Sequence, residues 1–131
     1  MRRVFKYHKN TIYDKSIVGE DSLSQLCEWV DDAYGVHPDF KIHTGSCMSF
    51  GYGVVHYKSS KQKLNTKSST EAKVVGVSYY LPYNICICSF MGAQGYDIKQ
   101  NILVQDNQSA IKIEKNGKKS NTGNSRHIDI R

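Results

Sequence analysis

A change of residue pattern near Ser69 constrains the fold of this chain most. Short segments rich in strand-forming residues come before it, and a helical pattern follows it to about Ala93. The expected strands are residues 25–31, 46–52 and 54–57, the last two joined by a turn at 51–53. Three antiparallel strands followed by helix, strand and helix predict an α/β fold in which helices cover a mixed sheet.

Shorter elements are expected around this frame. Residues 1–7 favour a short helix, residues 98–105 a strand and residues 107–115 a helix. Pro82 lies inside the long helix, where it predicts a kink or a break, and Gly95 is expected to end that helix.

The segment that leads into the long helix is basic and rich in hydroxyl groups. It carries Lys58, Lys61, Lys63 and Lys67. Ammonium, hydroxyl and amide groups suit phosphate and sugar oxygens better than an apolar partner. The alternative is a solvated loop ahead of an ordinary helix, which Ser68, Ser69 or Thr70 would cap.

Length and composition narrow the class of protein. The 131 residues are enough for one domain, and 18 Lys and Arg against 12 Asp and Glu give a net charge of +6, which favours an anionic partner such as nucleic acid. No apolar run approaches a membrane span and the N-terminus lacks a signal-peptide core, which predicts an intracellular, cytoplasmic protein. The four cysteines show no metal-binding spacing, so reduced and mostly buried thiols are expected.

Acidic residues follow two of the expected strands. Asp31 ends the first, Asp106 follows the fourth, and Asp129 lies near the end of the chain. Active sites collect at strand ends of α/β sheets, where converging carboxylates hold Mg²⁺ together with substrate phosphates. Turn and cap formation is the alternative. Trp29 and Tyr34 lie close to the first carboxylate and have rings that can stack on a base, but strand aromatics are more often part of the core.

Most of the chain from Trp29 onward resembles the ribonuclease H domain of copia-type retrotransposon polyproteins. The similar stretches are VDDAYGVHPDFKIHTGSCMSFGYG, SSKQKLNTKSSTEAK, GAQGYDIKQNILVQDNQSAI and SRHIDIR. RRVFKYHKNT resembles the segment that joins the reverse transcriptase to that domain. The resemblance implies a connector over residues 1–24 and a ribonuclease H-like domain over residues 25–131. That domain is expected to be incomplete at its C-terminus, because the family's last helix and fifth strand would lie beyond Arg131.

In that family the domain cuts the RNA strand of RNA–DNA hybrids with Mg²⁺ held by four acidic residues. The resemblance makes Asp31, Asp106 and Asp129 catalytic metal ligands, but the family motif S-S-T-E-A-E ends here in Lys73. Glu71 cannot replace the missing acid, because two residues along a helix is a rotation of about 200°. An ammonium at position 73 is expected to pair with Asp31 or Asp106 and to take the place of the metal. This copy is therefore expected to be inactive or severely impaired.

The resemblance also implies contacts to an RNA–DNA hybrid. The residues with suitable groups are Lys58, Lys61, Lys63, Lys67, Ser69, Asn107 and Gln108. Two other interpretations stay open, a non-catalytic nucleic-acid-binding remnant and a degenerate fragment with no present role. Residues 85–92 lack the charged face that the family keeps, which indicates either drift or a face that meets a partner. The oligomeric state is not predicted.

Overall fold

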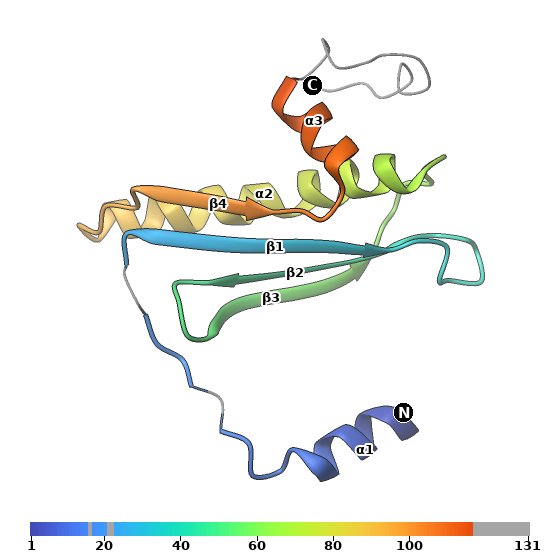
Figure 1. Ribbon diagram of the computed structural model, residues 1–131, viewed down its shortest axis with the longest axis horizontal. Coiled ribbons are helices and arrows are strands. Elements are labelled where there is room, and N and C mark those ends of the chain that lie inside the picture. The colour runs from blue at the N-terminus through green and yellow to red at the C-terminus, as the bar shows by residue number, and fades with distance from the viewer. Residues whose placement is uncertain (16, 21–22, 117–131) are drawn as a thin grey trace.

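Four strands form one mixed sheet in the order β3-β2-β1-β4 (Figure 1). The computed structural model describes residues 1–15, 17–20 and 23–116. Strands β1 (Gln25–Ala33), β2 (His43–Ser49) and β3 (Val54–Lys61) pair antiparallel, and β4 (Gln100–Val104) runs parallel to β1. The predicted α/β class, with three antiparallel strands and then a parallel one, is confirmed.

The two faces of this sheet differ sharply. Leu26, Glu28 and Val30 of β1 are buried, whereas Trp29 and Asp31 point to the opposite face and are exposed. Side chains alternate along a strand, so one face is covered by helices and the other is left open by the elements that the structure describes. The expectation that Trp29 belongs to the core is wrong, because its side chain projects from the open face and is 42% exposed.

Helix α2 (Ser69–Ala93) lies along the covered face (Figure 1). Ser68 caps it, since its Oγ accepts a hydrogen bond of 3.1 Å from the backbone N–H of Glu71. The helix continues through Pro82 without a break, and Gly95 beyond its end has a φ of +87°. Glycine adopts a positive φ readily, and this conformation lets the backbone N–H groups beyond the helix bond its last carbonyls. The predicted end of the helix is therefore confirmed.

The core lies between the first half of α2 and the sheet. Val30, Val77 and Tyr80 form its centre, with the partly buried Leu103 packed against them. Tyr80 is almost fully buried, and its hydroxyl donates a hydrogen bond of 3.0 Å to the backbone carbonyl of Thr44. A buried tyrosine needs such a partner, which fixes the position of the helix over the central strands.

The second half of α2 is largely uncovered. Ile85 and Phe90 are more than half exposed, and residues 74–93 include no charged side chain. By length and composition alone α2 could cross a membrane, which corrects the expectation that no apolar run approaches that length. Core helices meet the same criterion, and Ala72 and Val77 of this helix are buried against the sheet.

Two shorter helices complete the described chain. Helix α3 (Gln108–Asn116) buries Ala110 and Ile113 and contacts α2. Helix α1 (Arg2–Asn10) has no buried residue and lies on the side of the open sheet face (Figure 1). The N-terminal helix is thus confirmed but is longer than predicted.

Several expectations need correction. Strand β1 continues past Asp31 to Ala33, and β3 extends to Lys61. The first four residues of the basic segment, 58–61, are therefore part of a strand, because they pair with β2. The cysteines are free thiols as predicted, but none is fully buried: Cys27, Cys47 and Cys88 are partly exposed and Cys86 is exposed.

Candidate functional site

Lys73 lies between two carboxylates at one end of the sheet. Its Nζ is 2.9 Å from Asp31 Oδ1 and 2.5 Å from Asp106 Oδ1. The predicted pairing of Lys73 with Asp31 or Asp106 is therefore confirmed, and it involves both.

The sheet explains why these residues meet. Trp29 of β1 lies opposite Val104 of β4 in a parallel pair, so Asp31 and Asp106 each come two residues further along. Parallel neighbours end at the same edge. Lys73 is in the second turn of α2, which begins at that edge (Figure 1).

Lys73, Asp31 and Asp106, called the triad below, differ in the burial of their side chains. The side chain of Lys73 is 11% exposed, against 81% for Asp31 and 71% for Asp106. Burial works against the charged form of Lys73, but hydrogen bonds to Asp106 and Asp31 outweigh it and raise the pKa of the ammonium. The same hydrogen bond from Lys73, with one from the Asp32 backbone N–H, lowers the pKa of Asp31. The hydrogen bonds thus outweigh burial and keep the ion pair charged.

Asp32 is a neighbour that the sequence-based site did not include. It points to the covered face, where Thr44 Oγ1 and Gln62 Nε2 donate hydrogen bonds to its Oδ1. Burial raises its pKa, although these hydrogen bonds and the charge of Lys73 oppose the shift. The available signal was the pair Asp31-Asp32 itself, because adjacent residues of a strand face opposite sides.

The described residues do not fit a divalent cation. Lys73 Nζ occupies the space between Asp31 and Asp106, and within the described ranges no three His, Cys, Asp or Glu side chains come together as a metal site. A positive charge at that point repels a cation. Asp129, the third predicted ligand, lies outside the described residues.

Two of the predicted nucleic-acid lysines are engaged within the protein. Lys58 Nζ donates a hydrogen bond of 2.7 Å to Tyr83 Oη and lies 4.6 Å from the centre of that ring. Lys61 Nζ is 2.7 Å from Asp39 Oδ2. Both side chains remain partly accessible at the surface, so these contacts restrain the lysines without hiding them.

The other predicted contacts are spread over separate elements. Lys63 and Lys67 are exposed between β3 and α2, Ser69 is the exposed first residue of α2, and Gln108 is the exposed first residue of α3. Asn107 has a structural role, because its Oδ1 accepts hydrogen bonds from the backbone N–H groups of Ser109 and Ala110 at the start of α3.

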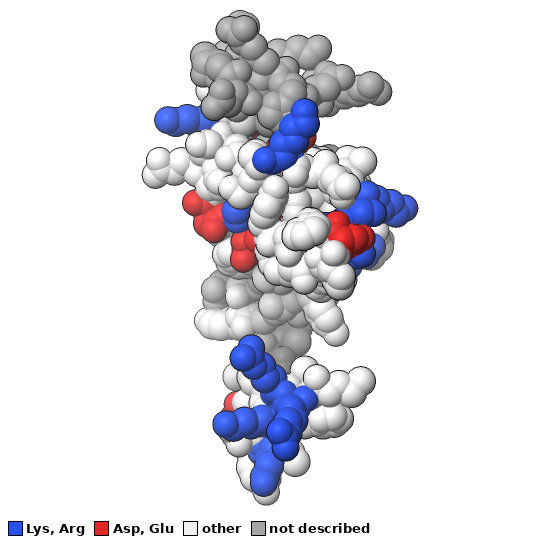
Figure 2. All heavy atoms as spheres, turned by 90° about the vertical axis from the view of Figure 1, so that its right-hand side faces the viewer, with Lys and Arg blue, Asp and Glu red and all other residues white. Residues whose placement is uncertain are grey.

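Basic side chains do not form one continuous surface on the face seen from the triad's end of the sheet. Figure 2 shows Lys and Arg in separate groups there, with a marked cluster on α1. That cluster consists of Arg2, Arg3, Lys6 and Lys9. No acidic residue lies in the helix, so its charge is entirely positive.

No protein-family model matches this chain. A search of the curated proteins likewise finds no significantly similar sequence.

Proposed function

We propose that this chain is a ribonuclease H-like domain, related to those of copia-type retrotransposons, whose metal site is closed by Lys73. It therefore does not cut RNA–DNA hybrids as it stands. The observation that carries the proposal is the contact of Lys73 Nζ with both Asp31 and Asp106. These are the two carboxylates in the described chain that the resemblance assigns to the metal.

The chemistry of the closed site follows from charge. A hydrolytic two-metal site needs carboxylates that are free to hold cations close to a scissile phosphate. Here the ammonium of Lys73 neutralises part of that negative charge and fills the gap between the two side chains. Mg²⁺ keeps near-ideal octahedral geometry and dehydrates reluctantly, so it competes poorly with an ion pair that is already formed.

Cleavage of a labelled RNA–DNA hybrid with and without Mg²⁺ tests the proposal. The wild-type protein, Lys73→Glu and Lys73→Met are compared, each checked for folding by circular dichroism. We expect cleavage only by Lys73→Glu and only with Mg²⁺. The Met variant separates removal of the ammonium from restoration of the carboxylate. A double variant, Lys73→Glu with Asp106→Asn, should lose the restored activity and shows that cleavage comes from this site.

Two outcomes would overturn the proposal. If the wild-type protein cuts as fast as Lys73→Glu, the lysine does not close the site. If a folded Lys73→Glu protein does not cut, the missing glutamate is not what silences the chain.

Nucleic-acid binding without cleavage is a second candidate, favoured by the net charge of +6 and the wholly basic charge of α1. Lys73 itself is unsuited to phosphate binding, because its charge is shared by two carboxylates and its side chain is 11% exposed. Binding would fall to the exposed lysines and to α1. Affinity that drops steeply with salt and does not respond to Mg²⁺ would identify this activity.

A further inference from the structure

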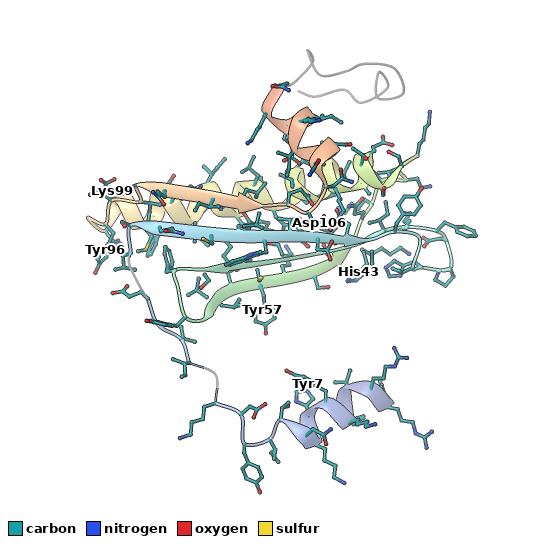
Figure 3. All side chains as sticks on the ribbon, viewed as in Figure 1. Tyr7, His43, Tyr57, Tyr96, Lys99 and Asp106 are labelled. Carbon is teal, nitrogen blue, oxygen red and sulfur yellow. The ribbon has the colours of Figure 1, made fainter. Side chains whose placement is uncertain are left out.

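The open face of the sheet carries a row of side chains that includes two aromatic rings. Trp29 of β1 lies opposite Cys47 of β2, and Cys47 lies opposite Tyr57 of β3. Directly opposed residues project from the same face, so all three stand on the side away from α2. Trp29 is 42% exposed and Tyr57 80% exposed. Figure 3 shows Tyr57 projecting from β3 toward the side where α1 lies.

The next row makes a depression beside these rings. Asp31, Gly45 and Ser59 lie opposite one another, and a side chain added at Gly45 would meet nothing within 4 Å. A groove is lined by residues of both rows, including Trp29, Gly45, Cys47 and Tyr57. Its floor is formed by small side chains and its walls by two aromatic ones.

The two walls offer aromatic faces to a planar ring. Trp29 and Tyr57 are two strands apart, which corresponds to about 9.6 Å between their backbones. The polar row adds hydrogen-bonding groups at one side, the carboxylate of Asp31 and the hydroxyl of Ser59, which is 2.7 Å from His43 Nε2.

Charge favours a nucleotide as the occupant. Helix α1, with Arg2, Arg3, Lys6 and Lys9 and no acidic residue, lies on this side of the sheet (Figure 1). A second copy of the chain would bring the same net positive charge to this side, so it is a poorer fit than a ligand with a flat ring and a phosphate.

We propose that this groove binds an unpaired nucleobase of a single-stranded nucleic acid, stacked on the aromatic rings of Trp29 and Tyr57, while basic residues of α1 attract the backbone. Stacking on exposed aromatic side chains of a sheet is tolerant of sequence, because every base has a π face. The inference shares the nucleic-acid ligand class of the proposed function but does not require a metal or cleavage.

Trp29 is the only tryptophan of the chain, so its fluorescence reports directly on the groove. The full chain is titrated without Mg²⁺ with a 12-nucleotide oligodeoxyadenylate and with an abasic oligomer of the same number of phosphates. We expect saturable quenching by the first and at least fivefold weaker binding of the second. Tyr57→Ala should weaken binding of the oligodeoxyadenylate by about 5- to 150-fold, the range for loss of one stacked base.

Tyr96→Ala is the matched control, because Tyr96 is also exposed but lies at the far end of α2 (Figure 3). The Tyr96→Ala variant should bind the oligodeoxyadenylate with the affinity of the wild-type protein. Equal quenching by the abasic oligomer, or a Tyr57→Ala variant that binds normally, would overturn the proposal. A third outcome would also overturn the proposal. If Phe5→Ala shifts the Trp29 emission in the absence of any oligomer, α1 already covers the groove.

The Lys73→Glu protein separates this inference from the proposed function. If this variant cuts the hybrid but its fluorescence is not quenched by the oligodeoxyadenylate, the base-binding groove is ruled out and the proposed function stands. If its fluorescence is quenched in a way that depends on Tyr57 but it does not cut the hybrid, the groove stands and the proposed function is ruled out.

Discussion

Lys73 Nζ lies 2.5 Å from Asp106 Oδ1, which ties the start of α2 to the end of β4. Together with the bond to Asp31, this contact places a mostly buried cation against two largely exposed anions. Solvent screens the exposed partners, so the pair contributes far less to stability than a fully buried one would. Its main effect is on the charge available at this edge of the sheet.

Lys73→Met should therefore cost little stability. We expect the free energy of unfolding to fall by about 1 kcal/mol, the upper range for partly exposed ion pairs, since Met retains much of the apolar packing. Urea unfolding at low and high salt measures it, with Lys67→Met, at an exposed position, as the control. A loss of several kcal/mol would contradict the screened character of the pair.

The contribution of Asp31 to the free energy of unfolding should disappear at acid pH. Hydrogen bonds from Lys73 and from the Asp32 backbone lower its pKa in the folded protein, so the ionised form is favoured by folding. Its stabilisation is then complete above the ordinary value of 3.8 and is lost as the pH falls through the lower folded value. Asp31→Asn should be less stable than wild type at pH 7, and the two should converge below pH 3.8. A difference that persists at the lowest pH would contradict this assignment.

The effect of Glu28 on the free energy of unfolding should change with pH in the opposite direction to that of Asp31. The side chain of Glu28 is fully buried, and burial raises its pKa even though the hydrogen bond from Ser46 and the charge of His56 oppose the shift. The folded protein therefore resists ionisation, and this cost grows as the pH rises above 4.5.

Glu28→Gln should be more stable than wild type at pH 7, with the advantage shrinking toward pH 4.5. Thermal unfolding across this range measures it. Glu28→Ala serves as the control, because it also removes the charge but leaves a cavity and should be destabilised at every pH. A Gln variant with no pH-dependent advantage would show that Glu28 is not the group responsible.

Two glycines of α2 should respond oppositely to alanine. A Cβ at Gly76 would come within 2.6 Å of Asp32 Oδ2 and 3.0 Å of Thr44 Cγ2, whereas a Cβ at Gly92 meets nothing within 4 Å. Gly76→Ala should destabilise the fold by about 1–3 kcal/mol through overpacking, and Gly92→Ala should stabilise it by up to about 1 kcal/mol through helix propensity.

Chemical denaturation of both variants checks this contrast. Adding Asp32→Ala to Gly76→Ala should recover part of the loss, since it removes the atoms that the new methyl group meets. Full additivity of the two substitutions would mean that the helix does not approach the sheet at this point.

The elements that depend on near neighbours could be predicted well. The cap among Ser68, Ser69 and Thr70, the end of the helix near Gly95 and the change to helix near Ser69 are local properties, because each rests on residues within a turn or two. The pairing of Lys73 with the carboxylates was also expected, though from the resemblance and not from spacing.

Other features depended on which strand lies beside which. Alternation alone says that Asp31 and Asp32 face opposite sides, but not which of them the helix covers. The exposure of Trp29, the burial of Glu28 and the extension of β3 to Lys61 were missed for the same reason. A strand residue is buried or exposed according to the partner on its face, and that partner comes from distant sequence.

The sequence by itself determined the α/β class and the long helix, because local propensity carries that information. That an acid was expected where Lys73 stands came from the resemblance alone. Only the tertiary structure decided that Asp31, Lys73 and Asp106 meet at one edge, and that Trp29 and Tyr57 stand together on an open face. Both juxtapositions follow from strand register and from the packing of α2, which are set by contacts between residues far apart in the chain.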